Sequence, residues 1–415
     1  MDAMNPESGQ PRDIRQRGWF MISGLAIGHS VFHWLIQSFA VVLPEVQRAF
    51  GLNAVGVGAV ITARDVASAV VALPGGVVVD SLRRHWGLLL AGCIVGFSIG
   101  AFLIGLSPFY PLLLVGVAVV AISHSLWHLP ASASLSYHFP RSRGMALSFH
   151  GVGGSVGDVL GPLATGALLL TLSWRGIISI YGAAPIFLAL LALWSFKNIG
   201  RKSESSVEGE TATDRAEVTK QLLRDRILWA ITLVKGMRSM SLAALVTVLP
   251  LYLNNELGLE PFDRGFHIGL LIMVGIVAKP IAGYLSDRLG RKQVLTPGLI
   301  WSGTICILMI FNGEGLILTV FIALLGLFLY PDQPILTAAI LDRVDQSVAS
   351  TALGLSSFVT FLMSATSPLI AAGLYEFIGA GATLYYVASL FFLAAAILAV
   401  LPLPRSDSQR FPKPG

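Results

Sequence analysis

The sequence predicts an all-α, polytopic membrane protein with twelve transmembrane helices in two pseudo-symmetric six-helix bundles. Hydrophobic residues make up 54% of the 415 positions and charged residues only 12%, about half the charged fraction of an average soluble domain. Twelve apolar stretches approach the roughly 20 residues that a helix needs to cross a bilayer. In addition, short patterns in the first half of the chain recur about half a chain length later.

The expected helices follow one another with short polar breaks. The first contains His29, His33 and Gln37, unlike the short apolar core of a cleaved signal peptide. Glycine is frequent, with 43 residues, which suits close helix packing in lipid. The expected spans are 19–43, 54–79, 87–106, 111–137, 144–172, 176–196, 227–253, 266–286, 294–311, 315–341, 349–374 and 380–403.

One break is much longer than the others. Residues 197–226 carry seven basic and six acidic side chains, which is typical of a solvated linker. The expected organisation is therefore a cytoplasmic tail (1–18), a six-helix bundle (19–196), a cytoplasmic linker (197–226), a second bundle (227–403) and a cytoplasmic tail (404–415).

The basic residues indicate the orientation of the chain. With both termini in the cytoplasm, 21 of the 28 Lys and Arg fall on the cytoplasmic side, against Arg48, Arg175 and Arg264 on the opposite side. This bias follows the positive-inside rule and predicts an integral membrane protein with both termini in the cytoplasm. It also explains the net charge of +5 by contact with anionic lipid rather than with nucleic acid. Two cysteines exclude a disulfide-built secreted domain.

The internal repeat has an offset of 206 or 207 residues. Four pairs of short patterns share this spacing and indicate a duplicated six-helix unit, an architecture of transporters. The pairs are Leu43-Pro44 with Leu249-Pro250, Gly51-Leu52 with Gly258-Leu259, Gly76 to Asp80 with Gly283 to Asp287, and Gly161-Pro162 with Ser367-Pro368.

The segment from Gly283 to Lys292 resembles, position for position, the signature loop of the major facilitator superfamily. The first copy departs from the pattern at Ser81 and Arg83. The resemblance covers nearly the whole chain and implies the twelve-helix fold of that superfamily. It also implies a charged cytoplasmic latch, although the same charges would equally set topology. The latch residues would be Gly76, Asp80, Arg84, Gly283, Asp287, Arg288 and Arg291.

Within the superfamily, the chain most resembles the fosmidomycin-resistance group of bacterial exporters. The similar segments are Gly28-His29 to Gln37-Ser38, His128 to Pro130, and Gly153-Gly154 to Gly161-Pro162. The helix over 144–172 also resembles the antiporter signature and so implies export, with ordinary small-residue packing as the alternative. The helix over 111–137 lacks the Arg of many drug/proton antiporters. The antiporter-like residues are Gly157, Gly161, Pro162 and Gly166.

Ionisable side chains inside the spans cost about 2.5–3.5 kcal/mol each on insertion scales, so they are the best functional candidates. Two histidine pairs have helical i,i+4 spacing, and the resemblance implies that the helices over 19–43, 111–137, 227–253 and 315–341 line a central cavity. The candidate substrate-binding residues are His29, His33, Gln37, His124, His128, His150, Lys235, Arg238, Asp332 and Gln333.

These residue types predict the class of substrate. Fixed cations and histidines favour a small organic anion, such as a phosphonate, carboxylate or sugar acid, held by Lys235 and Arg238. Histidine titrates near physiological pH, so a coupled proton is expected. The candidate proton carriers are His33, His124, Asp65 and Asp158. The expected protein is a monomeric secondary transporter that exports by rocking-bundle alternating access, with protons and membrane lipids as its other partners.

The sequence leaves other functions open. The same fold would run uptake as an anion/proton symporter. A divalent-metal exporter would use the histidine pairs, although Lys235 and Arg238 would repel the ion. A non-transporting sensor is a further alternative. The sequence has no phosphate-binding Walker loop, no Gly-x-Ser-x-Gly and no His-Glu-x-x-His, so we expect no enzyme, no cofactor and no resident metal.

Overall fold

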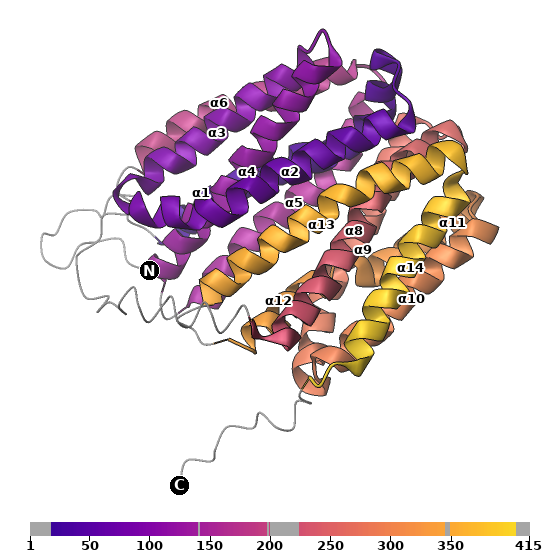
Figure 1. The fold of residues 1–415 in the computed structure, drawn as a ribbon. Coiled ribbons are helices and arrows are strands. Elements are labelled where there is room, and N and C mark those ends of the chain that lie inside the picture. The colour runs from indigo at the N-terminus through magenta and orange to yellow at the C-terminus, as the bar shows by residue number, and fades with distance from the viewer. Residues whose placement is uncertain (1–17, 140–141, 197–198, 200–223, 345–348, 404–415) are drawn as a thin grey trace, which may run out of the picture. The chain divides into compact units, whose positions relative to one another are not determined.

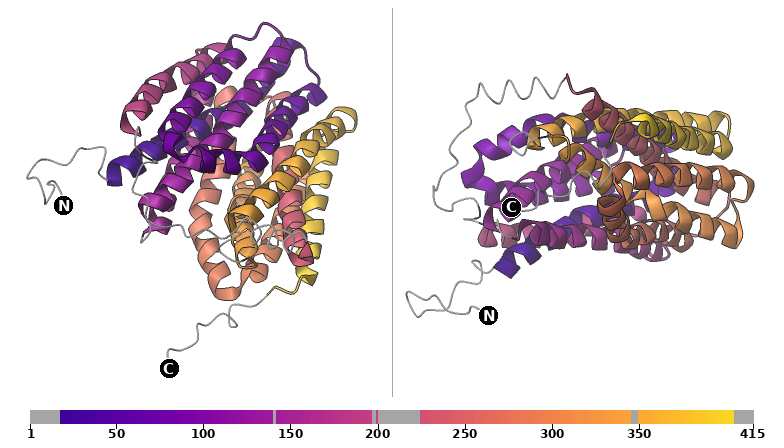
Figure 2. Two further views of the ribbon diagram at one scale, coloured as in Figure 1. Left: turned by 60° about the vertical axis from the view of Figure 1, so that its left-hand side comes forward. Right: turned by 90° about the horizontal axis from the view of Figure 1, so that it is seen from below.

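The computed structural model of the protein (Figure 1) describes residues 18–139, 142–196, 199, 224–344 and 349–403. Residues 1–17 of the expected N-terminal tail, the expected tail at 404–415 and most of the linker at 197–226 lie outside the described residues. Within the described residues, every regular element is a helix, and the additional views in Figure 2 show the same. The all-α prediction is therefore confirmed.

Each of the twelve expected spans corresponds to helix in the structure. Eleven candidate spans in the described part of the chain are long and apolar enough to cross a membrane; α5 is the exception, because it carries many small and polar residues. The helices are α1 Gly18–Phe50, α2 Ala54–Ser81, α3 Trp86–Gly105, α4 Tyr110–His138, α5 Arg143–Leu168, α6 Trp174–Ser195, α8 Arg226–Asn255, α9 Pro261–Leu289, α10 Arg291–Phe311, α11 Gly315–Leu329, α12 Asp332–Leu341, α13 Ala349–Phe377 and α14 Ala380–Val400.

Local sequence explains where several helices begin and end. The Asp225 side chain accepts from the N–H groups of Ile227 and Leu228 and caps α8. Gly51 and Gly258, which belong to one pair of the internal repeat, follow α1 and α8 with φ of 60° and 62°. This left-handed conformation is one that glycine adopts without strain. Both copies therefore place a left-handed glycine shortly after their first helix.

The contacts divide the chain into two compact units. Among the described residues, unit 1 takes those within 18–38, 74–161 and 172–199, and unit 2 takes those within 39–73, 162–171 and 224–403. The helices α1, α2 and α5 each run from one unit into the other, so the units are not the two sequence halves. The expected division at the linker stays a prediction.

Each unit is held together by its own helix packing. In unit 1, α3 packs against α4 and α6, and Gly100 and Gly116 bring the α3 and α4 backbones together. In unit 2, α8 packs against α13 and α14, α10 against α14, and α9 against α11. These helices bury a continuous apolar core in unit 2, and the buried charged residues Lys235, Arg238 and Asp332 lie on helices of that core.

Candidate functional site

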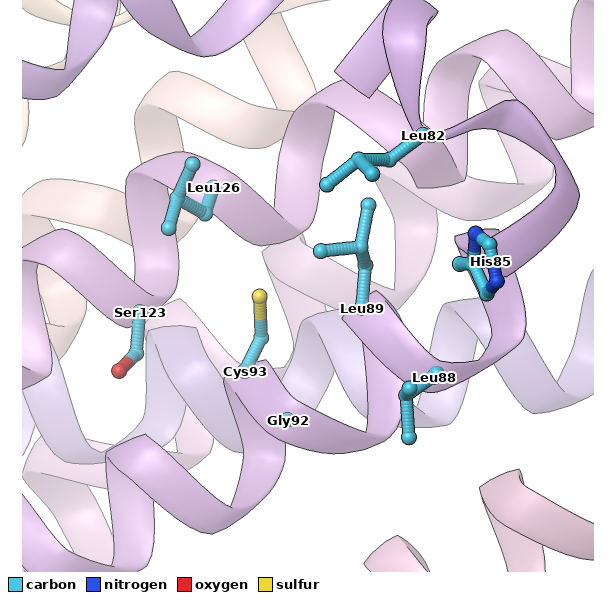
Figure 3. Close-up of a pocket in the computed structure, with 8 residues that line it drawn as sticks. All are labelled: Leu82, His85, Leu88, Leu89, Gly92, Cys93, Ser123 and Leu126. Atoms are coloured by element: carbon cyan, nitrogen blue, oxygen red, sulfur yellow. The ribbon is translucent and has the colours of Figure 1, made fainter. Parts of the chain in front are cut away.

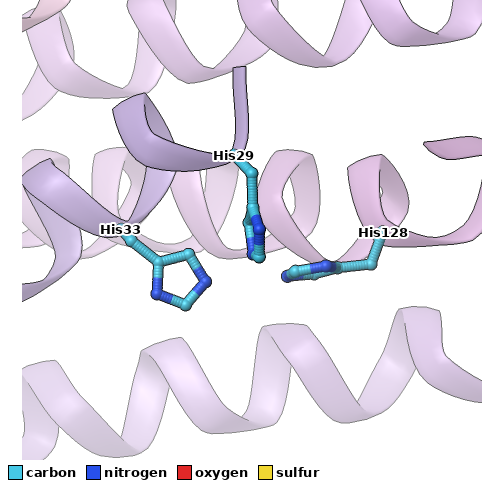
Figure 4. Close-up of side chains that lie close together, drawn as sticks. All are labelled: His29, His33 and His128. Atoms are coloured by element: carbon cyan, nitrogen blue, oxygen red, sulfur yellow. The ribbon is translucent and has the colours of Figure 1, made fainter. Parts of the chain in front are cut away.

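Five histidines of unit 1 gather between three helices. His29 and His33 come from α1, His124 and His128 from α4, and His150 from α5. The ring centroids of His29 and His33 lie 4.4 Å apart, and those of His29 and His128 lie 4.7 Å apart. Figure 4 shows the rings of His29, His33 and His128 converging. The i,i+4 pairs predicted from the sequence thus meet in one cluster.

Hydrogen bonds connect this histidine cluster (His29, His33, His124, His128, His150) to Asp158 of α5. Nδ1 of His33 lies 2.8 Å from Oδ1 of Asp158. Nε2 of His124 lies 3.4 Å from Nε2 of His33 and 2.9 Å from Nε2 of His128. The result is one chain of ionisable groups from α5 through α1 to α4.

His29 is held separately from that chain. Its Nδ1 donates to the His150 carbonyl at 2.8 Å, and its ring stacks on the His150 ring with centroids 4.2 Å apart. Its Nε2 is buried and has no hydrogen-bond partner among the described residues. Gln37, one turn of α1 beyond His33, is half-buried.

The glycines of α5 explain how this helix approaches α1 so closely. A Cβ on Gly157 would meet the Ser30 carbonyl and, at 2.8 Å, the Trp34 nitrogen. Gly153 and Gly161 pack in the same way against backbone atoms of α1. The antiporter-like motif therefore has a packing role in unit 1, as its alternative interpretation predicted. Past Pro162, in unit 2, Gly166 packs against Gly265 of α9.

A second group of charged residues lies in unit 2. Nε of Arg238 on α8 is 2.7 Å from Oδ1 of Asp332, the first residue of α12, and both side chains are buried. Arg238 also donates to the Leu329 carbonyl, at the interruption between α11 and α12. Gln333 is exposed and does not share their burial.

Lys235, one turn before Arg238, is only 6% exposed. In contrast to Arg238, it makes no ion pair and no hydrogen bond with any other described residue. A buried ammonium without a counter-ion is costly. Since Asp332 neutralises Arg238, Lys235 is the cation of this group that is available for a ligand.

Asp65, the remaining carboxylate among the proton-carrier candidates, lies in unit 2. Its oxygens accept from Arg64 Nε at 2.8 Å and from Ser364 Oγ of α13 at 2.7 Å. Thr62 donates to the Ala365 carbonyl one turn away, at 2.8 Å. Asp65 therefore belongs to a contact between α2 and α13, and not to the histidine cluster.

The second copy of the signature loop forms ion pairs within unit 2. Arg291 pairs with Asp287 and, at 3.0 Å, with Asp342 after α12. Arg288 lies over the Tyr284 ring. A Cβ on Gly283 would meet no described atom within 4 Å, so this glycine makes no close helix crossing here.

The first copy of that loop is only partly described. The side-chain environments of Gly76 and Asp80 lie outside the described residues, and Arg84 is exposed. Whether this copy forms a latch therefore stays a prediction.

A separate apolar pocket lies beside α3 and α4 in unit 1 (Figure 3). It has a volume of about 410 Å³, and none of the predicted site residues lines it. Its lining residues are Leu82, His85, Leu88, Leu89, Gly92, Cys93, Ser123 and Leu126.

Sequence reasoning missed one buried ion pair. Arg264 was assigned to a loop before an apolar span, but it lies inside α9, fully buried and paired with Glu45 of α1. It also donates to Asn254. No local sequence signal marked this pair, because its two residues are 219 positions apart and the repeated Leu-Pro pattern is followed by Leu251, not by an acid, in the second copy.

Comparison with known proteins agrees with this architecture. The fosmidomycin resistance protein of Escherichia coli is 21% identical over 66% of this chain and 67% of its own length. The glycerol-3-phosphate transporter of Bacillus subtilis is 18% identical over 82% of each chain. The crystal structure of a bacterial homolog of the human lysosomal transporter Spinster has a TM-score of 0.72 at 16% identity, and the match covers 94% of this chain and 96% of that one.

The family model described as Major Facilitator Superfamily matches residues 25–278 and 236–414. Together these ranges include nearly all of the apolar helices. The chain is therefore an integral membrane protein that belongs to the major facilitator superfamily, a family of transporters of small molecules.

Proposed function

We propose that this protein is a secondary active transporter of the bacterial inner membrane that exports a small organic anion in exchange for protons. Family membership supports transport itself. The chemistry of the two buried polar groups supports the choice of an anion and of a proton as the coupled species.

The main support for an anionic substrate is the environment of Lys235. A lysine that is 6% exposed and has no carboxylate partner in the described part of the chain gains most from a ligand that brings the missing negative charge. Arg238 lies one turn away and is already neutralised by Asp332, so a single anionic group on the ligand balances the site. The relative named a glycerol-3-phosphate transporter supports the same class of substrate.

Proton coupling draws support from the ionisable groups of both units. In unit 1, Asp158, His33, His124 and His128 form a continuous hydrogen-bonded chain. In unit 2, a buried carboxylate at Asp65 links α2 to α13 through Ser364. Ionisable groups inside a membrane are typical of proton pathways.

Export rather than uptake rests on two resemblances. One is the antiporter-like motif of α5, and the other is the relative named for fosmidomycin resistance. We further propose a monomer with both termini in the cytoplasm. Ser408→Cys in a cysteine-free background should react with an impermeant thiol reagent only from the cytoplasmic face, because the basic loops favour that orientation.

Purified protein screened by thermal shift against anionic, neutral and cationic metabolites tests the substrate class. A ligand present at 100 times its Kd stabilises the folded state by about 2.7 kcal/mol, so anions should raise the apparent Tm. Lys235→Met should remove that shift. Lys292→Met is the matched control, because Lys292 donates to the Leu401 carbonyl elsewhere in unit 2.

Flux in proteoliposomes tests coupling and direction. An inward proton gradient should drive the anion outward, and collapsing the gradient should stop concentrative flux. Stabilisation by cations alone would contradict the anion assignment. Anion accumulation on the same side as the protons would establish the uptake alternative instead.

A further inference from the structure

We propose that His29, His33 and His128 form a binding site for a divalent transition-metal ion of the zinc, cobalt and nickel class. One ring nitrogen from each of the three residues lies within 4.8 Å of the other two. The site belongs wholly to unit 1 and goes beyond anion transport, because it requires neither the anion nor Lys235.

The ring orientations match those of metal-ligating histidines. Such residues characteristically donate their second ring N–H to a carboxylate or to a backbone carbonyl, which fixes the tautomer and aims the other nitrogen at the ion. His33 has this arrangement through Asp158 Oδ1, and His29 has it through the His150 carbonyl, each at 2.8 Å. In both residues Nδ1 is thereby occupied and Nε2 remains as the ligand atom.

An unsatisfied nitrogen points to the same conclusion. His29 is 7% exposed, and its Nε2 is buried without a hydrogen-bond partner among the described residues. Leaving such a group unpaired costs about 1–3 kcal/mol. Since Nδ1 carries the proton, Nε2 of His29 has a lone pair. A metal ion would bind this lone pair, whereas another hydrogen-bond acceptor would leave it unpaired.

Only small movements are needed to bind the ion. Zn–N bonds of about 2.0–2.1 Å place tetrahedral ligand nitrogens roughly 3.3 Å from one another. The three ligand nitrogens now lie within 4.8 Å of one another, so small rotations of the rings would bring them to this distance. Nε2 of His128 now lies 2.9 Å from Nε2 of His124, so the ion would replace the proton shared by these rings, with His124 or water as the fourth ligand.

The charge of the surroundings is also suitable. The polar groups that face the three rings are His124 of α4 and His150 and Asp158 of α5. Asp158 therefore supplies a negative charge next to the site, and imidazole is a preferred ligand of zinc and nickel. Because His29 and His33 come from α1 and His128 comes from α4, the bound ion would link these two helices.

Binding of Co²⁺ to purified full-length protein without a polyhistidine tag tests the site by absorption spectroscopy. We expect one Co²⁺ per chain with the visible bands of a nitrogen-ligated tetrahedral ion, displaced by Zn²⁺. His33→Gln and His128→Gln should abolish the bands. His267→Gln is the control, because His267 is a buried helical histidine whose two ring nitrogens both bond within unit 2, away from the cluster.

Asp158→Asn tests the supporting hydrogen bond without removing a ligand, and it should weaken Co²⁺ binding by about 10- to 100-fold. Folded wild-type protein that binds no stoichiometric Co²⁺, or unchanged bands in both His33→Gln and His128→Gln, would overturn the assignment. The anion thermal shift is measured in metal-free buffer, so failure of the metal site and failure of the transport proposal give separate results.

Discussion

The buried ion pair between Arg238 and Asp332 allows a quantitative test of how unit 2 is built. The two side chains are only 3% and 6% exposed, and their atoms lie 2.7 Å apart. Removing one partner of a buried pair costs about 3–5 kcal/mol, because the other charge is left uncompensated. At roughly 2–4 °C per kcal/mol for a domain of 150–250 residues, Arg238→Met should lower the apparent Tm by about 6–20 °C.

Asp332→Asn should be the more damaging single change. It leaves Arg238 and Lys235 as two buried cations, one turn apart on α8, without a carboxylate between them. The double variant Arg238→Met/Asp332→Leu removes both charges and should recover most of the lost stability, because apolar replacements of buried pairs are often neutral or better.

Thermal unfolding of the four proteins in the same detergent forms a double-mutant cycle. We expect strong positive coupling in stability but no recovery of anion transport in the double variant. Two independent, additive losses would refute the reasoning, because they would mean that the charges do not compensate each other in the folded protein.

Three further changes test other contacts. Gly157→Leu should lower the apparent Tm strongly and abolish transport, because the new side chain would clash with the α1 backbone. Gly151→Leu is the control and should be tolerated, because a side chain at Gly151 would meet open space. Equal effects of the two variants would contradict the packing role. Asp225 should stabilise α8 in a pH-dependent way. Burial opposes its ionisation, but hydrogen bonds from Leu228, Arg343 and Ile227 outweigh it and hold its pKa below the usual 3.8. Its contribution should be complete above that pH and be lost as the pH falls through the lowered pKa, so Asp225→Asn should flatten the acid limb of a stability–pH curve. Ser364→Ala should cost about 1.5–3 kcal/mol, the value of a hydrogen bond to a charged group, and an unchanged melting curve would exclude a role of the Asp65 contact.

The fold was predictable from the sequence because the bilayer imposes a simple rule on helix length. That rule yields the spans but not the helix ends: α1 extends to Phe50, seven residues beyond the expected 43. It also hides the interruption between α11 and α12, since the stretch 315–341 is mostly apolar and Asp332 is its only charged residue. Pro331 and Pro334 were the local signal for that break.

The candidate residues were predictable, but most of their pairings were not. Charged residues in apolar spans stand out in any sequence, so Arg238 and Asp332 were identified before their contact was known. Their contact joins positions 94 residues apart, and nothing in local spacing encodes it. The pairing changes the interpretation of the site, because it leaves Lys235, and not Arg238, as the uncompensated cation.

The glycines of α5 and the histidine cluster depend on each other structurally, although each was identified from a different sequence signal. Gly154 lies against the His29 ring, and Gly157 lies against Cβ of His33. Because these positions have no side chain, α5 approaches α1 closely enough for Asp158 and the His150 carbonyl to reach the Nδ1 atoms of the two histidines. A larger residue at either glycine would separate the helices and break those hydrogen bonds, although all of the histidines would still be present. Small-residue packing and the proposed roles of the histidines are therefore not alternatives in this helix, since the packing places the acceptors that orient the histidines.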